Sequence, residues 1–257
     1  MRRLTEADIA VRADDLSVAR GGARVVEGVS ITLPRRGVLA VMGPTGAGKL
    51  TLAAFLAGRT EDGLSAAGGS ATVEGIDARH PGRARRQLTY VVGYMPQRAG
   101  ADLPSRLTVS EVIAEPITSR DRRVNARALA VRVATLLDEM QLPLGAAAKY
   151  PYELSAGMRQ RVALARALVL EPRLLVADDP YANLDIEVRT AARDAILRRR
   201  DDHGMAALMV TNDADAAREL NADVLVLRGG HPVAYGHGAD ALLWTPDGAD
   251  AQRAAVR

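Results

Sequence analysis

The stretch of sequence that decides the fold covers residues 38–57 and reads VLAVMGPTGAGKLTLAAFLA. Residues 38–42 form an apolar run of the strand type, and residues 51–57 form a run of the helical type. The turn between them is rich in glycine, so its backbone N–H groups can converge on one anion, and the following helix presents its positive end there. A strand, a glycine-rich turn and a helix in this order predict a loop that binds phosphate groups. We call it the phosphate loop, and its residues are Gly43, Pro44, Thr45, Gly46, Ala47, Gly48 and Lys49.

Lys49 is one of only two lysines, the other being Lys149, among 34 basic residues. A compact ammonium suits the β- and γ-phosphates of a nucleotide, which a broad guanidinium fits poorly. A glycine-rich turn with an incidental lysine is the alternative reading. The strand and the helix on either side of the turn make this alternative the less favoured of the two.

The composition is that of a globular protein and removes several classes of function. The chain has 257 residues, of which 48% are hydrophobic and 25% are charged, and its net charge of +3 is too small to indicate a nucleic-acid partner. It has no cysteine, which excludes disulfides, thiolate metal sites and cysteine nucleophiles. No apolar run approaches the roughly eighteen residues of a bilayer span. The charged N-terminal segment is unlike a signal peptide, so we expect an intracellular protein.

The order of strand-like and helical runs predicts an α/β fold. Apolar runs at 174–177, 207–210 and 224–227 alternate with helical patterns, which implies a mostly parallel sheet covered on both faces. The helical patterns cover 159–170, 187–200 and 214–220.

Other stretches depart from this alternation. Residues 9–35 and 69–92 combine Val, Ile and Thr with glycine turns, which predicts an antiparallel sheet. Residues 108–142 carry a helical periodicity, which we interpret as an insertion and not as a second domain. The small residues at 63–70 predict a loop.

Two further segments carry side chains that suit a phosphate site. Ser155 stands at the start of a helix, followed by Ala156 and Gly157, which leaves a hydroxyl and free N–H groups for an anion. A plain helix cap is the simpler reading of that segment alone. Asp178 and Asp179 end an apolar strand, where a carboxylate can hold Mg²⁺ beside the phosphate loop. Each pattern is common by itself, and their order along the chain is what gives them weight.

In this order, the motifs resemble those of the ATP-binding subunits of ABC transporters over nearly the full length of the chain. Residues 112–117 and 149–154 look most like the oligopeptide, dipeptide and nickel importer ATPases. The segments that carry the resemblance are a Walker A loop at 43–49, a Q-loop at 95–97, a signature at 154–158, a Walker B strand at 174–178, a D-loop at 182–185 and an H-loop at 210–213.

The resemblance implies a P-loop NTPase of the RecA-like type, with one ABC ATPase domain over residues 1–257. The implied parts are an antiparallel β subdomain at about 9–35 and 69–92, a helical subdomain at about 98–164, a RecA-like core at about 36–68 and 165–228, and a C-terminal tail at 229–257.

The resemblance also implies a mechanism that uses ATP and Mg²⁺. Two such subunits face head to tail and enclose two ATP molecules, each held by the Walker motifs of one chain and the signature of the other. The implied partners are a second ATP-binding subunit, membrane permease subunits and, indirectly, an extracytoplasmic substrate-binding protein, whereas no nucleic acid is expected. The Q-loop and the helical insertion would engage the permease, with this chain as a peripheral subunit on the cytoplasmic face of the membrane.

Roles of single residues follow from the same resemblance. The catalytic positions are those of Asp179, Gln97 and Asn212, and the Mg²⁺ positions are those of Asp178 and Gln97. Contacts to nucleotide fall to the phosphate loop and to Leu50, Thr51, Arg20, Ser155, Ala156, Gly157 and Asp185.

Four positions depart from the family pattern, and all of them concern the nucleotide. Leu50 replaces the Ser or Thr hydroxyl that binds Mg²⁺, and Thr51 lies about 100° further round the helix, so it cannot simply substitute. Asp179 replaces a glutamate that is one methylene longer, and a misplacement of about 1 Å can cost about 10²-fold in rate. Asn212 replaces a histidine and cannot carry a positive charge, and Arg20 takes the place of an aromatic residue against adenine.

We therefore expect the site on this chain's own Walker motifs to bind ATP but to hydrolyse it slowly or not at all. The signature keeps Ser155 and Gly157, so we expect a heterodimer in which this chain completes its partner's site, while the isolated chain has negligible ATPase activity. The alternative is that Asp179 and Thr51 compensate for each other in a rearranged site. The alternative for the whole protein is a scaffold or regulatory ATPase in a soluble multi-subunit enzyme, such as a phosphonate-breakdown complex.

Overall fold

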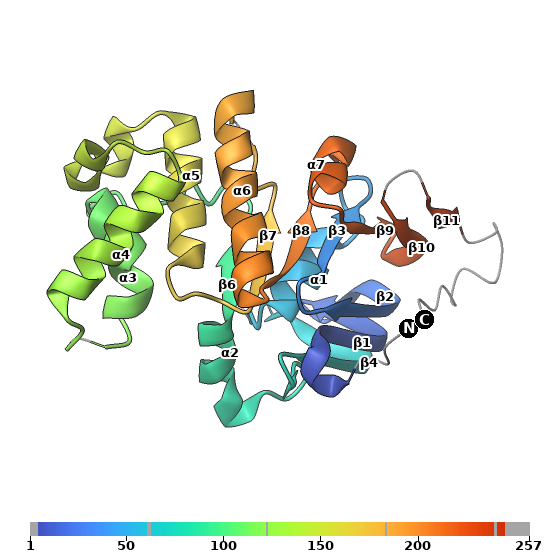
Figure 1. Ribbon diagram of the computed structural model, residues 1–257. Helices are drawn as coiled ribbons and strands as arrows, with labels where there is room; N and C mark the ends of the chain where they lie inside the picture. Colours follow the sequence, from blue (N-terminus) through green and yellow to red (C-terminus); the bar gives the residue numbers. More distant parts are fainter. Residues whose placement is uncertain (1–4, 61–62, 122, 183, 239–240, 245–257) are drawn as a thin grey trace.

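Two sheets and a group of helices make up the fold (Figure 1). The computed structural model describes residues 5–60, 63–121, 123–182, 184–238 and 241–244. Its strands are β1 (Ile9–Arg20), β2 (Ala23–Pro34), β3 (Val38–Met42), β4 (Ser65–Val73), β5 (Ile76–Asp77), β6 (Val92–Met95), β7 (Leu174–Asp178), β8 (Ala206–Val210), β9 (Asp223–Arg228), β10 (His231–His237) and β11 (Leu243–Trp244). Its α-helices are α1 (Lys49–Leu56), α2 (Arg85–Val91), α3 (Val109–Thr118), α4 (Ala126–Glu139), α5 (Ala156–Leu168), α6 (Ile186–His203) and α7 (Ala214–Glu219).

The larger sheet has the strand order β11-β10-β9-β3-β8-β7-β6. Strands β9, β3, β8, β7 and β6 run parallel, and β10 and β11 are antiparallel to their neighbours. All five residues of β7 and all five of β8 are buried, because helices or the second sheet cover both faces. The predicted α/β class with a mostly parallel sheet is confirmed.

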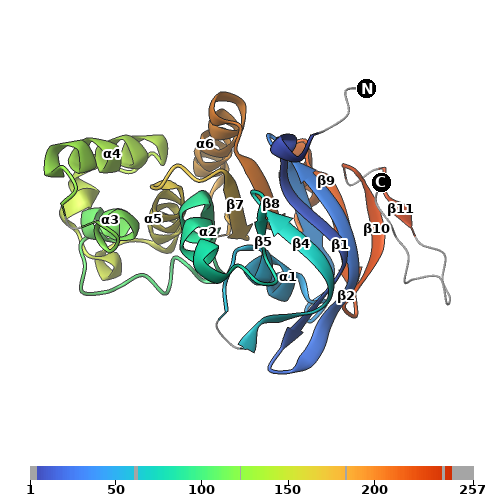
Figure 2. The same ribbon diagram turned by 90° about the horizontal axis from the view of Figure 1, so that it is seen from below.

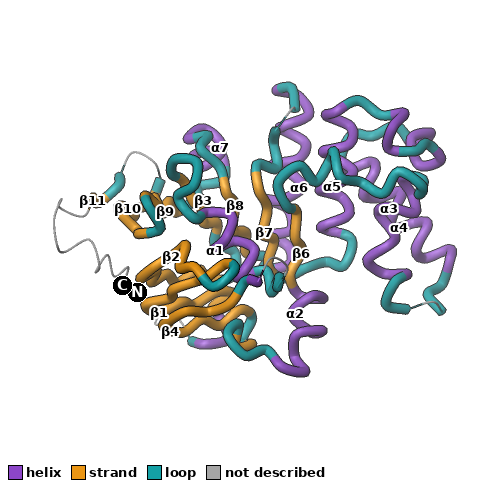
Figure 3. The backbone as a smooth tube through the Cα atoms, turned by 180° about the vertical axis from the view of Figure 1, so that it is seen from behind, coloured by secondary structure: helices purple, strands orange, loops and turns teal. Residues whose placement is uncertain are grey.

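Successive residues of the central strands face two different hydrophobic clusters, as the two-residue period of a strand requires. In β3, Val38 and Ala40 face the cluster of helices α3 to α6, whereas Leu39 and Val41 face the cluster that contains α1 and the second sheet. The parallel sheet therefore forms the middle layer of the molecule. Figure 3 shows α3, α4 and α5 grouped at one end of it.

The second sheet is antiparallel and has the order β2-β1-β4-β5. Helix α1 lies between this sheet and the parallel one, and its buried face includes Leu52 and Leu56. Figure 2 shows β1, β2 and β4 side by side over that helix, away from α3 and α4. The predicted antiparallel sheet is thus present.

Two details of the predicted segments are wrong. Residues 63–70 were expected to form a loop, but β4 begins at Ser65, since small residues pair their backbone with β1 as well as larger ones do. Residues 69–92 were expected to be antiparallel strand, but 85–91 form helix α2 and β6 joins the parallel sheet. Gly69 has φ +66°, and a Cβ there would lie 2.1 Å from the carbonyl oxygen of Asp15, so glycine is required where β1 and β4 shift register.

The helical segment over 108–142 contains α3 and α4, as its periodicity predicts. Thr108 caps α3 and exchanges hydrogen bonds with Glu111, which is the capping box that fixes a helix start. Among the described residues, none of the helices has both the length and the apolar character needed to cross a bilayer.

Candidate functional site

The phosphate loop connects the end of β3 to the start of α1. Gly43 has φ +136°, and a Cβ at this position would lie 2.0 Å from the carbonyl oxygen of Leu227. Gly48 has φ +92°, and a Cβ at this position would lie 2.8 Å from a methyl of Val26. Only glycine fits at these two ends of the loop, so the backbone itself is held where it can meet an anion. Pro44, Thr45 and Gly46 are exposed between them.

The ammonium of Lys49 lies over this loop. Its Nζ donates to the carbonyl oxygens of Gly43 at 2.6 Å and Pro44 at 2.9 Å. Since an ammonium has three donors, one remains for a further acceptor such as a phosphate oxygen. The loop residues expected to cradle phosphate are therefore brought together in one short segment around a cation.

Asn212 approaches the phosphate loop from the neighbouring strand. It lies just after β8, which pairs with β3, and its Oδ1 accepts a hydrogen bond of 3.0 Å from the backbone N–H of Gly43. The resemblance assigns Asn212 to a position that contacts the γ-phosphate. In the structure, its side-chain oxygen is hydrogen-bonded to the backbone of the phosphate loop. Gly43 is therefore held on both sides, with its N–H on Asn212 and its carbonyl oxygen on Lys49.

Asp178 ends β7, two strands away from β3 in the sheet. It is buried, with 8% of its surface exposed, and its Oδ2 has no hydrogen-bond partner. Burial, and secondarily the charge of Asp179, raise the pKa of Asp178 to about 6, although the nearby charge of Lys49 lowers it. A buried carboxylate with one unsatisfied oxygen near the loop fits a Mg²⁺ ligand, since a divalent cation supplies the charge that the oxygen lacks.

Asp179 is exposed and has φ +41°, in the left-handed region. Its N–H donates to the carbonyl oxygen of Val210 at 2.9 Å, and its carbonyl oxygen accepts from Nε2 of Gln160 at 2.9 Å. The backbone of Asp179 is thus fixed on both sides, while its side chain is left free for solvent or substrate. A carboxylate in this place can accept a hydrogen bond from a water molecule or a substrate.

Gln160 is a site residue that the sequence reasoning missed. It lies in the second turn of α5, has 7% of its surface exposed, and holds the carbonyl oxygen of Asp179. A Cβ at Gly100 would lie 2.8 Å from the backbone nitrogen of Gln160, so the segment after Gln97 packs closely on α5. The sequence gives no signal for Gln160, because a glutamine between two arginines on a helix is usually exposed.

Leu50 and Thr51 lie in the first turn of α1. Leu50 is half-buried and packs against the cluster between the two sheets, and Thr51 has 5% of its surface exposed. The hydroxyl of Thr51 therefore belongs to the side of the helix that faces the interior of the protein. The structure gives no sign that Thr51 takes over the role of the missing hydroxyl at Leu50.

The signature segment is exposed at the start of α5. Oγ of Ser155 accepts from the N–H of Met158 at 3.2 Å, which makes it the helix cap, and Ser155 and Ala156 are exposed while Gly157 is half-buried. Helix α5 packs in the cluster on one face of the parallel sheet, and α1 packs on the other. The signature therefore faces outward on an element separate from the phosphate loop.

The remaining predicted residues lie at the ends of elements. Asp185 is exposed and caps α6, since its Oδ1 accepts from the N–H of Val188 at 3.0 Å. Gln97 is exposed in the turn after β6. Arg20 ends β1, half-buried, with its Nε buried and without a hydrogen-bond partner. Asn183 of the D-loop lies outside the described residues.

A groove of about 400 Å³ runs between the end of the parallel sheet and α3, beside Pro96 of the Q-loop. Nη2 of Arg166 donates to Oε2 of Glu115 at 2.9 Å across it. The guanidinium of Arg59 lies over the ring of Tyr94 at 5.5 Å. Other lining residues include Thr89, Pro116, Ser119 and Arg120.

The burial of Asp178 makes a prediction about stability. Because the folded pKa is raised above the ordinary value, the charged carboxylate opposes folding above pH 6, and this cost fades as the pH falls through the folded pKa. We expect Asp178→Asn to raise the free energy of unfolding at pH 7.5 by about 1–3 kcal/mol without metal or nucleotide. Urea unfolding of both chains measures this difference.

The same comparison at pH 4.5 is the control, because Asp178 is then mostly protonated in the folded chain and the gain should shrink. The exposed Asp179→Asn should give a smaller gain than Asp178→Asn at pH 7.5, because the charge of Asp179 contributes only secondarily to the raised pKa of Asp178. A stability gain for Asp178→Asn that does not depend on pH would contradict this account of the carboxylate.

Comparisons with known proteins find a matching family and several similar sequences. The family described as ABC transporter matches residues 26–182. A peptidoglycan transport ATP-binding protein YejF of Agrobacterium fabrum is 32% identical over 84% of this chain and 39% of its own length. The oligopeptide transport ATP-binding protein OppD of Mycobacterium tuberculosis is 33% identical over 85% of this chain and 35% of its own length. The sulfate/thiosulfate import ATP-binding protein CysA of Burkholderia mallei is 35% identical over 80% of this chain and 56% of its own length. The chain thus spans between about a third and three fifths of the length of these relatives.

Solved structures share the fold. The ATP-binding cassette MJ0796, solved as a dimer in a post-hydrolysis state with ADP and phosphate, has a TM-score of 0.79 at 21% identity, over 88% of this chain and 98% of that one. The structure of cbiO1 from Clostridium perfringens has a TM-score of 0.74 at 23% identity, over 90% and 89%.

Proposed function

Because the chain belongs to the ABC transporter ATP-binding family, we propose that it is an ATP-binding subunit whose own site is impaired and whose signature completes a partner's site. The observation that carries the proposal is the contrast between the two halves of the chain. The phosphate loop with Lys49 has the shape expected for phosphate binding. In contrast, Leu50, Asp179 and Asn212 replace the three family residues that would act at the γ-phosphate. The signature half keeps its serine exposed at a helix start.

ATP fits this chain through backbone N–H groups of the phosphate loop and the ammonium of Lys49. Asp178 would hold Mg²⁺, which when bound neutralises phosphate charge and polarises the bond that breaks. Leu50 adds no ligand to that ion, since a hydrocarbon has no lone pair. Asp179 is fixed by its backbone, and its shorter side chain leaves the attacking water less well oriented.

A second ATP-binding subunit explains the exposed signature. Ser155 and Gly157 belong to a helix on the face of the sheet opposite α1, so they serve a nucleotide held by another chain. The positive end of α5 and its unpaired N–H groups suit a phosphate. Because a partner with a complete Walker set would hydrolyse ATP, a heterodimer makes use of both halves of this chain.

The groove beside the Q-loop supports the permease contact. It is lined by charged and aromatic side chains, with Glu115 and Arg166 paired across it, and both are only partly exposed, at 37% and 38% of their side chains. A short helix of a membrane subunit with polar and apolar residues fits such a groove. The chain would then act at the cytoplasmic face of the membrane as a peripheral subunit, coupling ATP to import. Peptide-type cargo is the proposed class, because OppD is a relative and residues 112–117 and 149–154 resemble that subfamily.

Affinity purification of the full chain from its own cell's detergent-solubilised membranes tests this function. We expect a second ATP-binding subunit and two permease subunits to co-purify. Arg166→Glu should reduce recovery of the permease about tenfold, because a reversed charge in the groove repels the helix that docks there. Thermal unfolding of the variant checks that it is folded, because the substitution also places two carboxylates side by side at Glu115.

The matched control is Arg198→Glu, which reverses the charge of an exposed arginine on α6. It should leave recovery of the permease unchanged. Soluble metabolic enzymes in place of membrane subunits would contradict transport and favour the scaffold alternative.

A further inference from the structure

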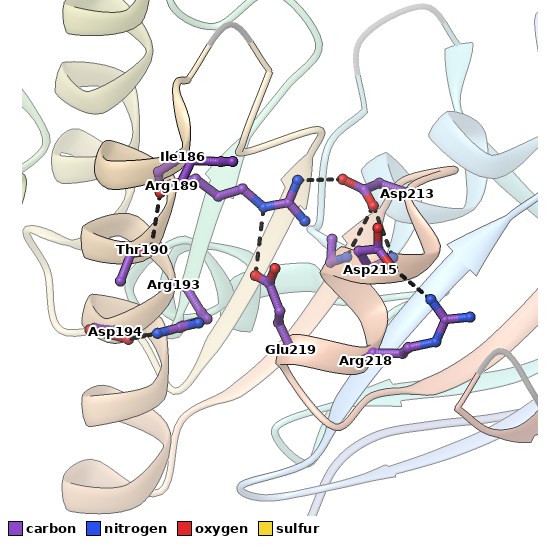
Figure 4. A network of polar contacts seen from close by, with 10 residues as sticks. Ile186, Arg189, Thr190, Arg193, Asp194, Asp213, Asp215, Arg218 and Glu219 are labelled. Carbon is purple, nitrogen blue, oxygen red and sulfur yellow. Dashed lines mark hydrogen bonds and ion pairs between the residues drawn. The ribbon is translucent and has the colours of Figure 1, made fainter.

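A network of polar contacts joins the start of α6 to the start of α7 (Figure 4). Arg189 is at its centre: its Nη1 donates to Oδ2 of Asp213 at 2.7 Å, and its Nε lies 3.6 Å from Oε2 of Glu219. Its guanidinium also lies over the ring of Tyr181, 5.3 Å from the centre. Only 22% of the side chain is exposed, so these contacts are partly shielded from water.

Asp213 is the residue through which Arg189 reaches the nucleotide site. Its Oδ1 caps α7 by accepting from the N–H groups of Asp215 at 2.9 Å and Ala216 at 3.1 Å, while its Oδ2 accepts from Arg189. Both carboxylate oxygens are thus used, one for each helix. Burial raises the pKa of Asp213, but the Ala216 hydrogen bond and the charge and hydrogen bond of Arg189 outweigh it, so the pKa is lowered overall and the carboxylate is charged at neutral pH.

Asn212 directly precedes Asp213 and accepts from the N–H of Gly43. The segment is also fixed from behind, because the N–H of Thr211 donates to the carbonyl oxygen of Val41 at 3.2 Å and Oγ1 of Thr211 accepts from the N–H of Asp213 at 3.1 Å. Asn212 thus lies between Thr211 and Asp213, which are both held by hydrogen bonds, and Arg189 in turn holds Asp213.

The backbone of Arg189 is connected to the cap of α6. Its backbone N–H donates to the carbonyl oxygen of Asp185, the cap of α6, one helical turn earlier. Tyr181, beneath its guanidinium, lies between Asp179 and that cap. Arg189 therefore touches both the segment after β7 and the segment after β8, which border the phosphate loop on the same edge of the sheet.

We propose that Arg189 is a positioning residue that holds Asn212 on the amide of Gly43, and so links the D-loop end of α6 to the shape of the phosphate loop. It acts through Asp213 and does not touch nucleotide itself. The proposal goes beyond the proposed function, since it concerns the nucleotide-free chain and does not depend on whether this site hydrolyses ATP.

The sequence offers a direct probe of the Gly43 amide. Met42-Gly43 is the only methionine–glycine pair in the 257 residues, so labelling methionine with carbonyl ¹³C and glycine with ¹⁵N selects this amide alone in an NMR spectrum. Its hydrogen exchange rate reports how often the bond to Asn212 opens. Asn212→Ala, which removes the acceptor, gives the exchange rate of the freed amide.

We expect Arg189→Ala to speed hydrogen exchange of the Gly43 amide about tenfold, because residues in one hydrogen-bond network are energetically coupled. Asp213→Asn should do the same, because asparagine still caps a helix but loses the ion pair with Arg189. The double variant should exchange no faster than either single one. The matched control is Arg193→Ala, one turn further along α6, whose guanidinium pairs with Asp194 on its own helix at 2.8 Å and should leave Gly43 within twofold.

Two results would overturn the proposal. One is exchange at Gly43 that stays within twofold of the parent chain in Asp213→Asn, the variant that keeps the cap and is therefore expected to fold even if Arg189→Ala does not. The other is an equal acceleration of all glycine amides, which would show that Arg189 only stabilises the fold.

Discussion

ATP turnover by the assembled complex is expected to fall by at least about 100-fold when Gly157 of this chain is replaced by aspartate, and to keep most of its rate when Lys49 is replaced by alanine. The reason is the proposed division of labour. A carboxylate in the first turn of α5 would repel the phosphates of the partner's nucleotide. Lys49, in contrast, would under this proposal serve only the chain's own site.

The measurement is phosphate release by the purified complex, with permease and both ATP-binding subunits present. Gly145→Asp is the matched control: it also adds an aspartate at a glycine, and a Cβ at Gly145 would meet nothing within 4 Å. It should leave turnover unchanged. If Lys49→Ala stops turnover as completely as Gly157→Asp, the two sites are equally needed and the proposed asymmetry is wrong.

Restoring the family residues at three positions is expected to raise the ATPase rate of the isolated chain by about 100-fold or more. The variant combines Leu50→Ser, Asp179→Glu and Asn212→His. The serine supplies the missing Mg²⁺ ligand, and the glutamate reaches one methylene further toward water. The histidine can carry a positive charge, and in its neutral form one ring nitrogen can accept the bond from Gly43. Each change alone should do little, because all three groups act on one transition state.

Phosphate release at high protein concentration measures this gain, since two copies of this chain must then face each other. Adding Lys49→Ala to the triple variant should return the rate to its starting value. Thermal unfolding checks the cost of Leu50→Ser, which removes a half-buried side chain and is expected to destabilise α1 by about 1–2 kcal/mol. A folded triple variant that binds ATP and remains inactive would refute the claim that these three residues cause the impairment.

The prediction of the phosphate loop depends on local sequence alone. The loop and its flanking strand and helix lie within 38–57, so its function depends on neighbours in the chain, and β3 has the predicted bounds. The start of strand β4 could not be predicted in this way from the small residues at 63–70. Its strand exists because β1 offers backbone partners, and the residues of β4 themselves have little preference for a strand.

Residues 38–57 by themselves predict a phosphate-binding loop, because a glycine-rich turn between a strand and a helix, with a lysine at its end, can be recognised without knowing any distant contact. The amino-acid sequence also determined which groups are missing, since a leucine cannot bind a metal wherever it lies. The packing of strands and helices places Asn212 on the amide of Gly43 and Gln160 on the backbone of Asp179, and it lets Arg189 join two helices beside them. These contacts bring together residues separated by up to 169 positions, and hydrogen bonds of about 3 Å depend on how strands and helices pack, which no local pattern encodes.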